Sequence, residues 1–530
     1  MIPLLGRLST LLLAVLLFAA PARPQSVSIT VSNALSCDQQ TARLTAASTC
    51  SGIVTYRFSG PNGFTAVNTS GLVSATVNGA YSVTATGDGG CVATGTAAVG
   101  STLPPDYLPL VDLFNATNGP GWLNKTGWLT NCDPCSGWFG VGCTNNRVTS
   151  LSFATYFPGN GLSGQLPASI GQLSALQTLN LSYNQTLSGP LPASLTQLSN
   201  LQTLNLSYNR FSGTAFDQLT GIPSLQVINL AYNSFSGSLP EAVSNLTNLK
   251  ELYAGANKLT GSIPASLGNL TNLVQLDVSL NKLTGPIPAS LGMLTKLNWL
   301  YLSNNLLAGG IPAELGNLTQ LRTLYLGNNG LTGAIPVSLG NLINVELLGV
   351  DNNQLSGTIP NSLAALTKLR SLYLQNNQLT GTLPDYLGSF PALSEFRAEN
   401  NQLTGSIPAG LGGLPQLRYV TLQNNRLEGC IPPSLTPLCA GYVNIDNNPG
   451  LPAWTDFCAN GANGQVSVRN GNWQDAGTWA CGRVPTVRDF VTLKHTVTVP
   501  AGTGQQARQI RYTATGSLQY ETGGTVQIGQ

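Results

Sequence analysis

The sequence predicts a mainly β solenoid flanked by two small β-rich modules. Three observations support this fold class. An asparagine recurs every 24 residues from Asn233 to Asn425, and a fixed period of this size is typical of a solenoid. The same apolar frame returns around each of these asparagines. Before and after the repeats, short runs alternate apolar with polar residues, as β-strands with one buried face do.

The unit around Asn305 shows what each position of the frame does. Leu300 and Leu302 lie two residues apart, so both point to one side of a short strand. The Asn305 amide can donate and accept buried hydrogen bonds at the following turn. Gly309 suits a tight bend and Pro312 keeps the chain extended, so we expect an irregular or weakly helical return path. Each coil buries its leucines only against its neighbours.

This frame, LxxLxxLxLxxNxLxGxIPxxL, resembles the plant-type leucine-rich repeat from Leu151 to about Leu451. The resemblance implies a right-handed superhelix with short strands on its concave face. Two departures are visible: one extra residue precedes Leu187, and Ala215 with Phe216 replaces the Ile-Pro pair. We expect local irregularities at both places.

The first residues indicate a secretory signal peptide. Arg7 precedes an apolar run over residues 11–20, and small residues follow at Ala20 and Ala22. The run is shorter than the roughly 20 residues that cross a bilayer. We therefore expect a secreted or cell-surface protein without a membrane span after signal cleavage, in a compartment that permits disulfides.

The flanking segments predict two further modules. Tyr81, Val83, Gly90 and Cys91 give the N-terminal segment a resemblance to the immunoglobulin-like β-sandwiches of bacterial surface proteins. The last segment resembles a β-rich module of secreted bacterial proteins. The predicted organisation is a signal peptide (1–25), an immunoglobulin-like sandwich (26–100), an N-terminal cap with a helix and a disulfide (101–147), the solenoid (148–451) and a C-terminal β-rich module (452–530).

Ten cysteines lie outside the regular repeats. The sequence WFGVGC at residues 138–143 resembles the WxGVxC element of the cap of plant-type repeats, which implies a bridge between Cys135 and Cys143. Cys430 and Cys439 bracket the last coil, and we expect them to form a matching pair. The three cysteines of the N-terminal module cannot all pair within it, and we expect Cys37 with Cys91. The sequence leaves open the pairing of Cys50, Cys132, Cys458 and Cys481.

Several kinds of chemistry are excluded or disfavoured. Only 8% of residues are charged and the formal net charge is +2, so nothing favours a nucleic-acid partner. The single histidine, His495, can build neither a histidine-based triad nor a metal cluster, and we expect it to be structural. Glu395 and Glu399 lie about 13 Å apart along a strand, too far for a glycosidase pair. We expect no enzymatic activity, no cofactor and no metal.

The predicted concave face carries the candidate site. Neighbouring coils place equal positions about 4.8 Å apart, so these residues form columns. One column holds several tyrosines, and Trp299 lies beside Tyr301 and Tyr325, where rings can supply contact area to a ligand. Tyr183, Tyr208 and Tyr232, which border the turn, favour a structural role. The candidate ligand-binding residues are Tyr253, Trp299, Tyr301, Tyr325, Asp351, Tyr373, Glu395, Arg397 and Tyr419.

We therefore expect a monomeric, non-enzymatic binding protein for an extracellular protein, peptide or glycan. One alternative is a structural spacer or adhesin stalk in an extracellular matrix, which would have an inert concave face. Others are an ice-binding surface and an inhibitor of a wall-degrading enzyme, which are known among leucine-rich repeat relatives.

Overall fold

The computed structural model describes residues 25–32, 41–100, 103–153, 159–448, 450–460, 465–467, 469–479, 481, 484–486, 489–507 and 509–528. The expected signal peptide lies outside these residues, apart from its last position. The chain forms two compact units, Met1–Leu108 with Thr130–Asp133, and Pro109–Leu129 with Pro134–Gln530. Among the described residues, no helix has the length and apolar character needed to cross a membrane.

The N-terminal unit contains two antiparallel sheets. Alternating side chains such as Leu44, Phe58 and Tyr81 are buried between short polar stretches and form its core. The first sheet has the order β1 (Val27–Val31), β2 (Ala42–Ser48), β5 (Leu72–Ala75). The second has the order β4 (Thr65–Asn68), β3 (Val54–Ser59), β6 (Gly79–Gly87), β7 (Val92–Val99), with a 3-10 turn η1 (Pro61–Gly63).

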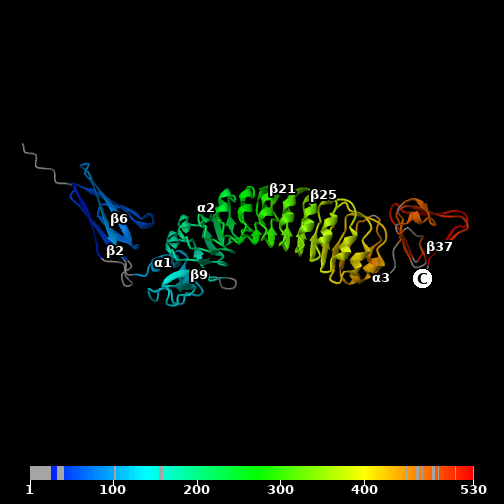
Figure 1. Ribbon diagram of the computed structural model, residues 1–530, viewed down its shortest axis with the longest axis horizontal. Helices are drawn as coiled ribbons and strands as arrows, with labels where there is room; N and C mark the ends of the chain where they lie inside the picture. The colour runs from blue at the N-terminus through cyan, green and yellow to red at the C-terminus, as the bar shows by residue number, and fades with distance from the viewer. Residues whose placement is uncertain are drawn as a thin grey trace, which may run out of the picture. The chain divides into compact units, whose positions relative to one another are not determined.

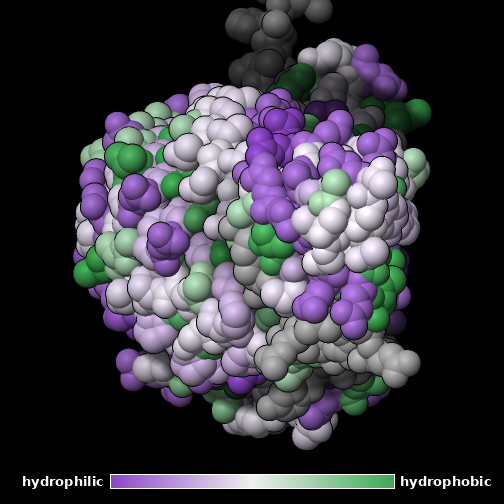
Figure 2. Space-filling view, turned by 90° about the vertical axis from the view of Figure 1, so that its right-hand side faces the viewer, coloured by the Kyte–Doolittle hydropathy of each residue, from purple (hydrophilic) through white to green (hydrophobic). Residues whose placement is uncertain are grey.

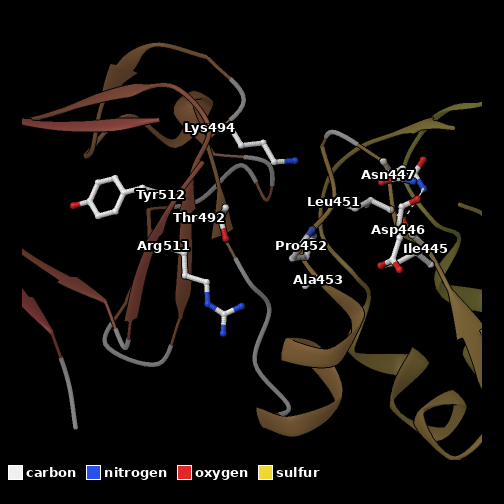
Figure 3. A pocket seen from close by; sticks show the side chains of 11 residues that line it. Ile445, Asp446, Asn447, Leu451, Pro452, Ala453, Thr492, Lys494, Arg511 and Tyr512 are labelled. Carbon is white, nitrogen blue, oxygen red and sulfur yellow. Dashed lines mark hydrogen bonds between the residues drawn. The ribbon is translucent and has the colours of Figure 1, made fainter. Parts of the chain in front are cut away.

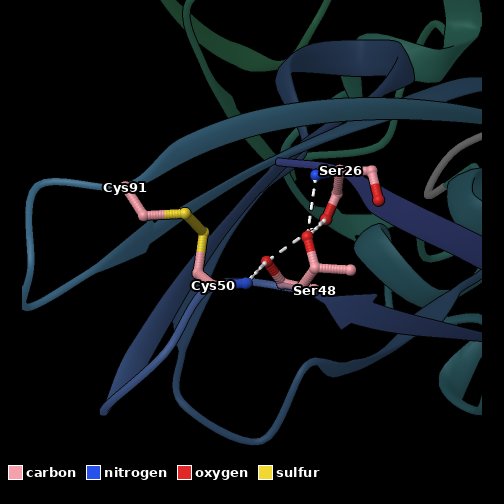
Figure 4. Close-up of a disulfide and its surroundings, with 5 residues drawn as sticks. Ser26, Ser48, Cys50 and Cys91 are labelled. Carbon is pink, nitrogen blue, oxygen red and sulfur yellow. Dashed lines mark hydrogen bonds between the residues drawn. A yellow bond between two sulfur atoms is a disulfide. The ribbon is translucent and has the colours of Figure 1, made fainter. Parts of the chain in front are cut away.

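One disulfide of this unit corrects the sequence prediction. Cys91 bonds to Cys50, with Cα atoms 5.7 Å apart, so the expected pair Cys37–Cys91 is wrong (Figure 4). Cys50 follows the end of β2 and Cys91 directly precedes β7, and a side chain at Gly87 would touch the Cβ atoms of both. The two cysteines therefore meet through the fold of two sheets, which spacing alone does not reveal. Cys37 lies outside the described residues.

The solenoid is built on a sheet of 14 strands, parallel except for the antiparallel first pair β8–β9 (Figure 1). Its strands lie in chain order, and each parallel strand is joined to the next by the return path of its coil, which confirms the fold class. The strands are β8 (Val141–Thr144), β9 (Arg147–Ser152), β11 (Thr178–Asn180), β13 (Thr203–Asn205), β15 (Val227–Asn229), β17 (Glu251–Tyr253), β18 (Gln275–Asp277), β20 (Trp299–Tyr301), β22 (Thr323–Tyr325), β24 (Leu347–Gly349), β26 (Ser371–Tyr373), β28 (Glu395–Arg397), β30 (Tyr419–Thr421) and β32 (Tyr442–Asn444).

The return path of most coils is a short second strand followed by a 3-10 turn, and the coil that begins with β17 has only an isolated bridge at Ser262 before its turn. Each turn follows the proline of the Ile-Pro pair or its equivalent, as at Pro312 before η8. The predicted irregularity at Ala215 and Phe216 is confirmed, because α2 (Phe216–Leu219) replaces the 3-10 turn there. The 3-10 turns are η3 (Ala168–Gln172), η4 (Ala193–Gln197), η5 (Glu241–Asn245), η6 (Ala265–Asn269), η7 (Ala289–Met293), η8 (Ala313–Asn317), η9 (Val337–Asn341), η10 (Asn361–Ala365), η11 (Asp385–Ser389), η12 (Ala409–Gly413) and η13 (Pro433–Ala440).

The second strands form shorter parallel sheets beside these turns. Their bounds are β10 (Ser163–Gly164), β12 (Thr186–Gly189), β14 (Arg210–Gly213) and β16 (Ser234–Phe235) in one sheet; β19 (Thr284–Gly285), β21 (Leu306–Gly310), β23 (Gly330–Ala334), β25 (Gln354–Gly357) and β27 (Gln378–Leu379) in another; and β29 (Thr404–Gly405) with β31 (Arg426–Leu427) in a third.

The repeated asparagines hold successive coils together. We call them the ladder asparagines: Asn184, Asn209, Asn233, Asn257, Asn281, Asn305, Asn329, Asn353, Asn377, Asn401, Asn425 and Asn448. The Asn305 amide donates to the carbonyls of Leu302 (3.1 Å) and Val278 (3.0 Å), and its oxygen accepts from the Leu283 amide (3.0 Å). Each such side chain satisfies backbone groups of its own coil and of the preceding one, inside a leucine core.

The extra residue before Leu187 has a measurable consequence for the ladder. The Leu187 amide donates to the Asn184 carbonyl (2.8 Å) instead of to the next ladder asparagine. The Asn209 oxygen is consequently buried without a hydrogen-bond partner. This coil therefore has a weaker ladder contact than the regular ones.

The residue directly before each ladder asparagine, here called the turn position, has a left-handed backbone. Its φ lies between 51° and 64° in every coil from Tyr183 to Asn447. Asparagine tolerates this conformation better than other non-glycine residues, which explains the Asn-Asn pairs of the later coils.

Aromatic residues and disulfides close the two ends of the solenoid. At the N-terminal end, α1 (Tyr107–Ala116) and η2 (Gly119–Gly121) precede packed rings of Trp122, Trp128 and Trp138. Cys135 bonds to Cys143, the pair that the cap resemblance implies.

At the C-terminal end the expected pair Cys430–Cys439 is wrong. Cys439 bonds to Cys458, because α3 (Trp454–Asn460) packs on η13 and brings the two Cα atoms within 5.6 Å. Cys430 bonds to Cys481 instead, with Cα atoms 4.9 Å apart. Both partners come from beyond the repeats, where the period gives no information on pairing.

The C-terminal strands pair in parallel, so this segment is a second, smaller coil. The three sheets are β33 (Gln465–Val466), β35 (Phe490–Leu493), β38 (Gln509–Tyr512); β34 (Gly471–Asn472), β36 (Thr496–Val499), β39 (Ser517–Tyr520); and β37 (Gly504–Ala507), β40 (Thr525–Ile528), with a turn η14 (Ala476–Thr478). Figure 2 views the chain from this end and shows hydrophilic residues interspersed with smaller hydrophobic areas.

Trp473 and Trp479 fill the core of this coil with the alternating valines of its strands. His495 lies in the bend between β35 and β36. Its Nδ1 lies 2.7 Å from the Ser467 carbonyl oxygen, which is a structural contact.

Candidate binding face

In most coils the first strand presents two partly exposed side chains and buries the apolar residue between them. Trp299 and Tyr301 are half-buried on either side of the fully buried Leu300, and Tyr325 is placed in the same way on β22. The three rings therefore lie outside the leucine core, on the surface that strand alternation predicts.

Strand register places most of the candidate residues in two columns. Tyr253, Asp277, Tyr301, Tyr325, Gly349, Tyr373 and Arg397 are successive partners in one column. Glu395 and Tyr419 are partners in the neighbouring column. Tyr253, Trp299 and Tyr301 share this face but lie several coils from Arg397. Burial, followed by the nearby Glu251 carboxylate, raises the pKa of Tyr253 to about 12.

Five residues form a contiguous group, here called the arginine cluster: Tyr373, Glu395, Arg397, Tyr419 and Tyr442. The Arg397 Nε donates to a Glu395 oxygen (2.6 Å), and the Tyr373 hydroxyl donates to the other oxygen (2.6 Å). The Arg397 guanidinium lies over the Tyr419 ring at 4.6 Å and over the Tyr373 ring at 5.4 Å. Burial lowers the pKa of Arg397, but the Glu395 carboxylate more than offsets it, so the guanidinium stays charged.

Sequence reasoning did not include Tyr442 in the site. Its ring stacks on Tyr419 with centroids 4.6 Å apart, and 54% of the residue is exposed. The signal was available, because Tyr442 follows Tyr419 in the same column. The degenerate last repeat obscured it.

Asp351 differs most from its prediction as an exposed ligand contact. Only 2% of it is exposed. A Cβ atom at Gly349 would fall 2.4 Å from the Tyr325 ring, and one at Gly327 would fall 2.6 Å from Asp351 Oδ1. The two glycines therefore let the ring lie down over the backbone and cover the carboxylate. Burial is the main reason that the pKa of Asp351 is raised.

Asp351 begins a polar column that lies two positions before each ladder asparagine, here called the inner column: Asp351, Gln375, Glu399, Gln423 and Asp446. In this column Asp351 Oδ1, Gln375 Oε1 and Gln423 Oε1 are buried without a hydrogen-bond partner. Glu399 differs, because it accepts from the Thr421 hydroxyl. Such orphan acceptors are uncommon in a folded protein.

The turn positions beside the inner column form an amide ladder. The side-chain amide of Asn447 donates to the Asn424 oxygen (2.7 Å), and the same bond repeats at Asn400 and Asn376 (2.6 Å each). Asn376 donates to Asn352 (2.7 Å), which in turn donates to Asp351 Oδ2 (2.6 Å).

Tyrosines occupy the same turn positions in the first coils. The rings of Tyr183, Tyr208 and Tyr232 stack in parallel, with centroids 4.6 and 4.3 Å apart. Tyr232 is 49% exposed. The contacts agree with a structural role, but they also leave a row of hydroxyls at the surface.

A cavity of about 500 Å³ lies near the last coil (Figure 3). Asp446, Asn447 and Leu451 line it from the solenoid, and Lys494 and Arg511 from the C-terminal strands. Its lining comes from segments far apart in the sequence, so no sequence pattern indicates it. Among the described residues, no group of three or more His, Cys, Asp or Glu side chains converges as a metal site.

Comparisons with known proteins agree with this architecture. Residues 211–436 match the model of a leucine-rich repeat region. The leucine-rich repeat protein FLOR 1 of Arabidopsis thaliana is 40% identical over 78 residues, which cover 15% of this chain and 22% of that protein. The chain thus spans about a fifth of the length of this curated relative.

Two solved structures of plant receptor ectodomains are similar. That of the Arabidopsis thaliana receptor kinase GASSHO1/SCHENGEN3, in complex with CASPARIAN STRIP INTEGRITY FACTOR 2, has a TM-score of 0.59 and 28% identity over 78% of this chain and 53% of its own. That of the Arabidopsis receptor kinase HAESA, in complex with an IDA peptide hormone ligand, has a TM-score of 0.53 and 26% identity over 78% and 74%. The period, the asparagine ladder and these matches together show a leucine-rich repeat solenoid, with residues 211–436 as the matched region.

Proposed function

We propose that this chain is an extracellular, non-enzymatic binding protein whose concave face holds a peptide segment of a partner. Disulfides between Cys50 and Cys91, Cys135 and Cys143, and Cys439 and Cys458 support an oxidising compartment. The two receptor ectodomains described above share this solenoid fold, and that of HAESA is in complex with a peptide hormone.

The arginine cluster is the observation that carries this proposal. Tyr373, Arg397, Tyr419 and Tyr442 stack on one another before any ligand is present, so their side-chain entropy is already lost. Preordered tyrosine and arginine side chains on a half-exposed face are typical of binding hot spots.

The cluster favours a peptide over a glycan. A sugar stacks on an open ring face, but Arg397 covers one face of Tyr419 and Tyr442 covers the other. At Tyr419 the ring edge and the hydroxyl remain accessible beside the Arg397 guanidinium, and these groups suit the amide groups and side chains of a peptide.

Selection from a displayed library of random dodecapeptides tests the proposal with the full chain, its disulfides intact. We expect enriched sequences on the wild type. Replacing both rings, Tyr419→Ala with Tyr442→Ala, should weaken a selected peptide about thirtyfold or more, because both are hot-spot residues.

Thr203→Ala is the matched control, because Thr203 has the same place on its strand as Tyr419 but lies far from the cluster. It should change affinity little. Unchanged melting curves would show that both variants fold. Equal affinity of the double variant and the control would contradict the proposal, and enrichment of glycans on an array in place of peptides would contradict the choice of ligand.

A further inference from the structure

Two adjacent members of the inner column have unused acceptors. Asp351 is 2% exposed and Gln375 is 8% exposed, yet Asp351 Oδ1 and Gln375 Oε1 have no hydrogen-bond partner. They belong to neighbouring coils in parallel register, since the Asn352 amide donates to the Gln375 carbonyl (2.8 Å). Equal positions of neighbouring coils lie about 4.8 Å apart. Two oxygens that need donors are therefore held side by side.

The equivalent position in earlier coils shows that these side chains are not required by the fold. Serine occupies it at Ser279 and Ser303, and glycine occupies it at Gly327. The Ser279 hydroxyl donates to Asp277 within the same coil, so its hydrogen-bonding need is met without a ligand. A buried carboxylate with one empty oxygen is costly by comparison, which points to a partner that the free protein lacks.

Charge and chemistry specify that partner. The concave positions of the three coils from Leu347 to Asn400 carry three carboxylates, Asp351, Glu395 and Glu399, against one guanidinium, Arg397. Arg397 is already held by Glu395. A metal ion would find a single free carboxylate here, and no three-ligand group exists among the described residues. A positively charged group with several N–H donors fits better.

The residues around Asp351 allow a ligand group to reach its carboxylate. The Tyr325 ring covers Asp351 from above Gly349, and neither Gly349 nor Gly327 has a Cβ that would hinder rotation of the ring. A ring turned aside would lie beside the entering group, where its face can contact a cation.

We propose that Asp351 and Gln375 form a specificity subsite that binds one arginine or lysine side chain of the bound peptide. This inference rests on the proposed function. Its N–H groups donate to Asp351 Oδ1 and Gln375 Oε1, and the Tyr325 ring flanks it. The arginine cluster provides general peptide affinity, and this subsite selects a basic residue at one position.

The dodecapeptide selection separates the two proposals. Peptides enriched on the wild type should share a basic residue at a fixed position, and those enriched on Asp351→Ser should not. Replacing that arginine by citrulline in one selected peptide should weaken binding to the wild type about tenfold or more, as expected for a charged hydrogen bond, and should leave binding to Asp351→Ser nearly unchanged.

Asp277→Ser is the matched control, because Asp277 is another carboxylate of the concave face but its oxygen is already occupied. It should keep the basic preference. Serine is native to the inner-column position in four other coils, at Ser182, Ser207, Ser279 and Ser303, so Asp351→Ser should fold, which its melting curve will check.

The inference is overturned if wild-type peptides show no basic preference, or if Asp351→Ser retains it. It is also overturned if a crystal structure of the complex shows water or a metal ion on Asp351 and Gln375, with the basic side chain elsewhere. Loss of all enrichment in the Tyr419 and Tyr442 double variant, with the basic preference intact in the wild type, supports both proposals. Absence of any enriched peptide on the wild type removes both.

Discussion

The first and last halves of the solenoid have the same backbone at the turn position but different side chains. Tyr183, Tyr208, Tyr232, Ala256 and Leu280 occupy it in the early coils, and asparagine occupies it from Asn304 to Asn447. The left-handed φ is common to all of them. The repeat therefore dictates the conformation, and the side chain is chosen for another reason.

Asparagine fits this conformation and extends the amide ladder, whereas tyrosine and leucine adopt it at a cost of about 1–2 kcal/mol each. The early coils recover part of that cost by stacking rings, and the later coils need no compensation. The inner column differs in the same way, with small residues early and Asp351, Gln375 and Glu399 late. In the later coils, therefore, the turn position is free of backbone strain, whereas the buried polar side chains of the inner column lower the stability of the fold.

The largest difference between the halves should appear at the ladder asparagines. Asn305→Ala leaves the Leu283 amide without a partner and removes one of the two side-chain bonds that the Val278 and Leu302 carbonyls each accept, so the free energy of unfolding should fall by roughly 3 kcal/mol. Asn209→Ala should cost about 1 kcal/mol less, because the Asn209 oxygen has no partner to lose. Urea unfolding of both variants measures this. Equal losses would show that the extra residue before Leu187 does not weaken the ladder.

A reciprocal exchange at the turn position tests the backbone argument. Leu280 is 47% exposed, so Leu280→Asn should raise the free energy of unfolding by about 1 kcal/mol by relieving the left-handed strain. Asn376→Leu should lower it by about 1–2 kcal/mol, because it introduces that strain and removes two ladder bonds. Thermal melts of the two variants provide the measurement, and shifts of the same sign would contradict the argument.

The inner column predicts a smaller effect that depends on pH. Burial raises the pKa of Asp351 above its usual value of 3.8. As the pH rises from 3.8 to the raised pKa, the unfolded chain loses this proton before the folded protein does, so the free energy of unfolding should fall. Asp351→Ser should lack this decrease and should be the more stable protein at neutral pH. Urea unfolding of the two proteins at several pH values will show it, and a constant difference between them would contradict the burial of the charge.

The repetitive part of the fold could be predicted because the same residue pattern recurs in every coil. The strands, the leucine core and the ladder follow from alternation and from a period that Asn305 and its equivalents mark. A local irregularity at Ala215 and Phe216 could be predicted from one visible departure, but not that it takes the form of the helix α2.

Features that depend on one unique contact were missed. Cys439 and Cys458 meet because α3 packs on η13, and nothing in their spacing requires it. Asp351 is buried because residues 327 and 349 happen to be glycine and let Tyr325 fold over it. Strand alternation assigns Asp351 to the outer face correctly, but it carries no information on what lies above that face.

The amide ladder of the later coils has a direction. Each side chain from Asn447 to Asn376 passes its N–H toward the N-terminal neighbour, and the last N–H, that of Asn352, ends on Asp351. Aligned amide dipoles polarise one another, so the row carries a net dipole whose positive end lies at the buried Asp351 carboxylate. A substitution at Asn424, several coils away, therefore reaches the electrostatic potential at Asp351 without touching it.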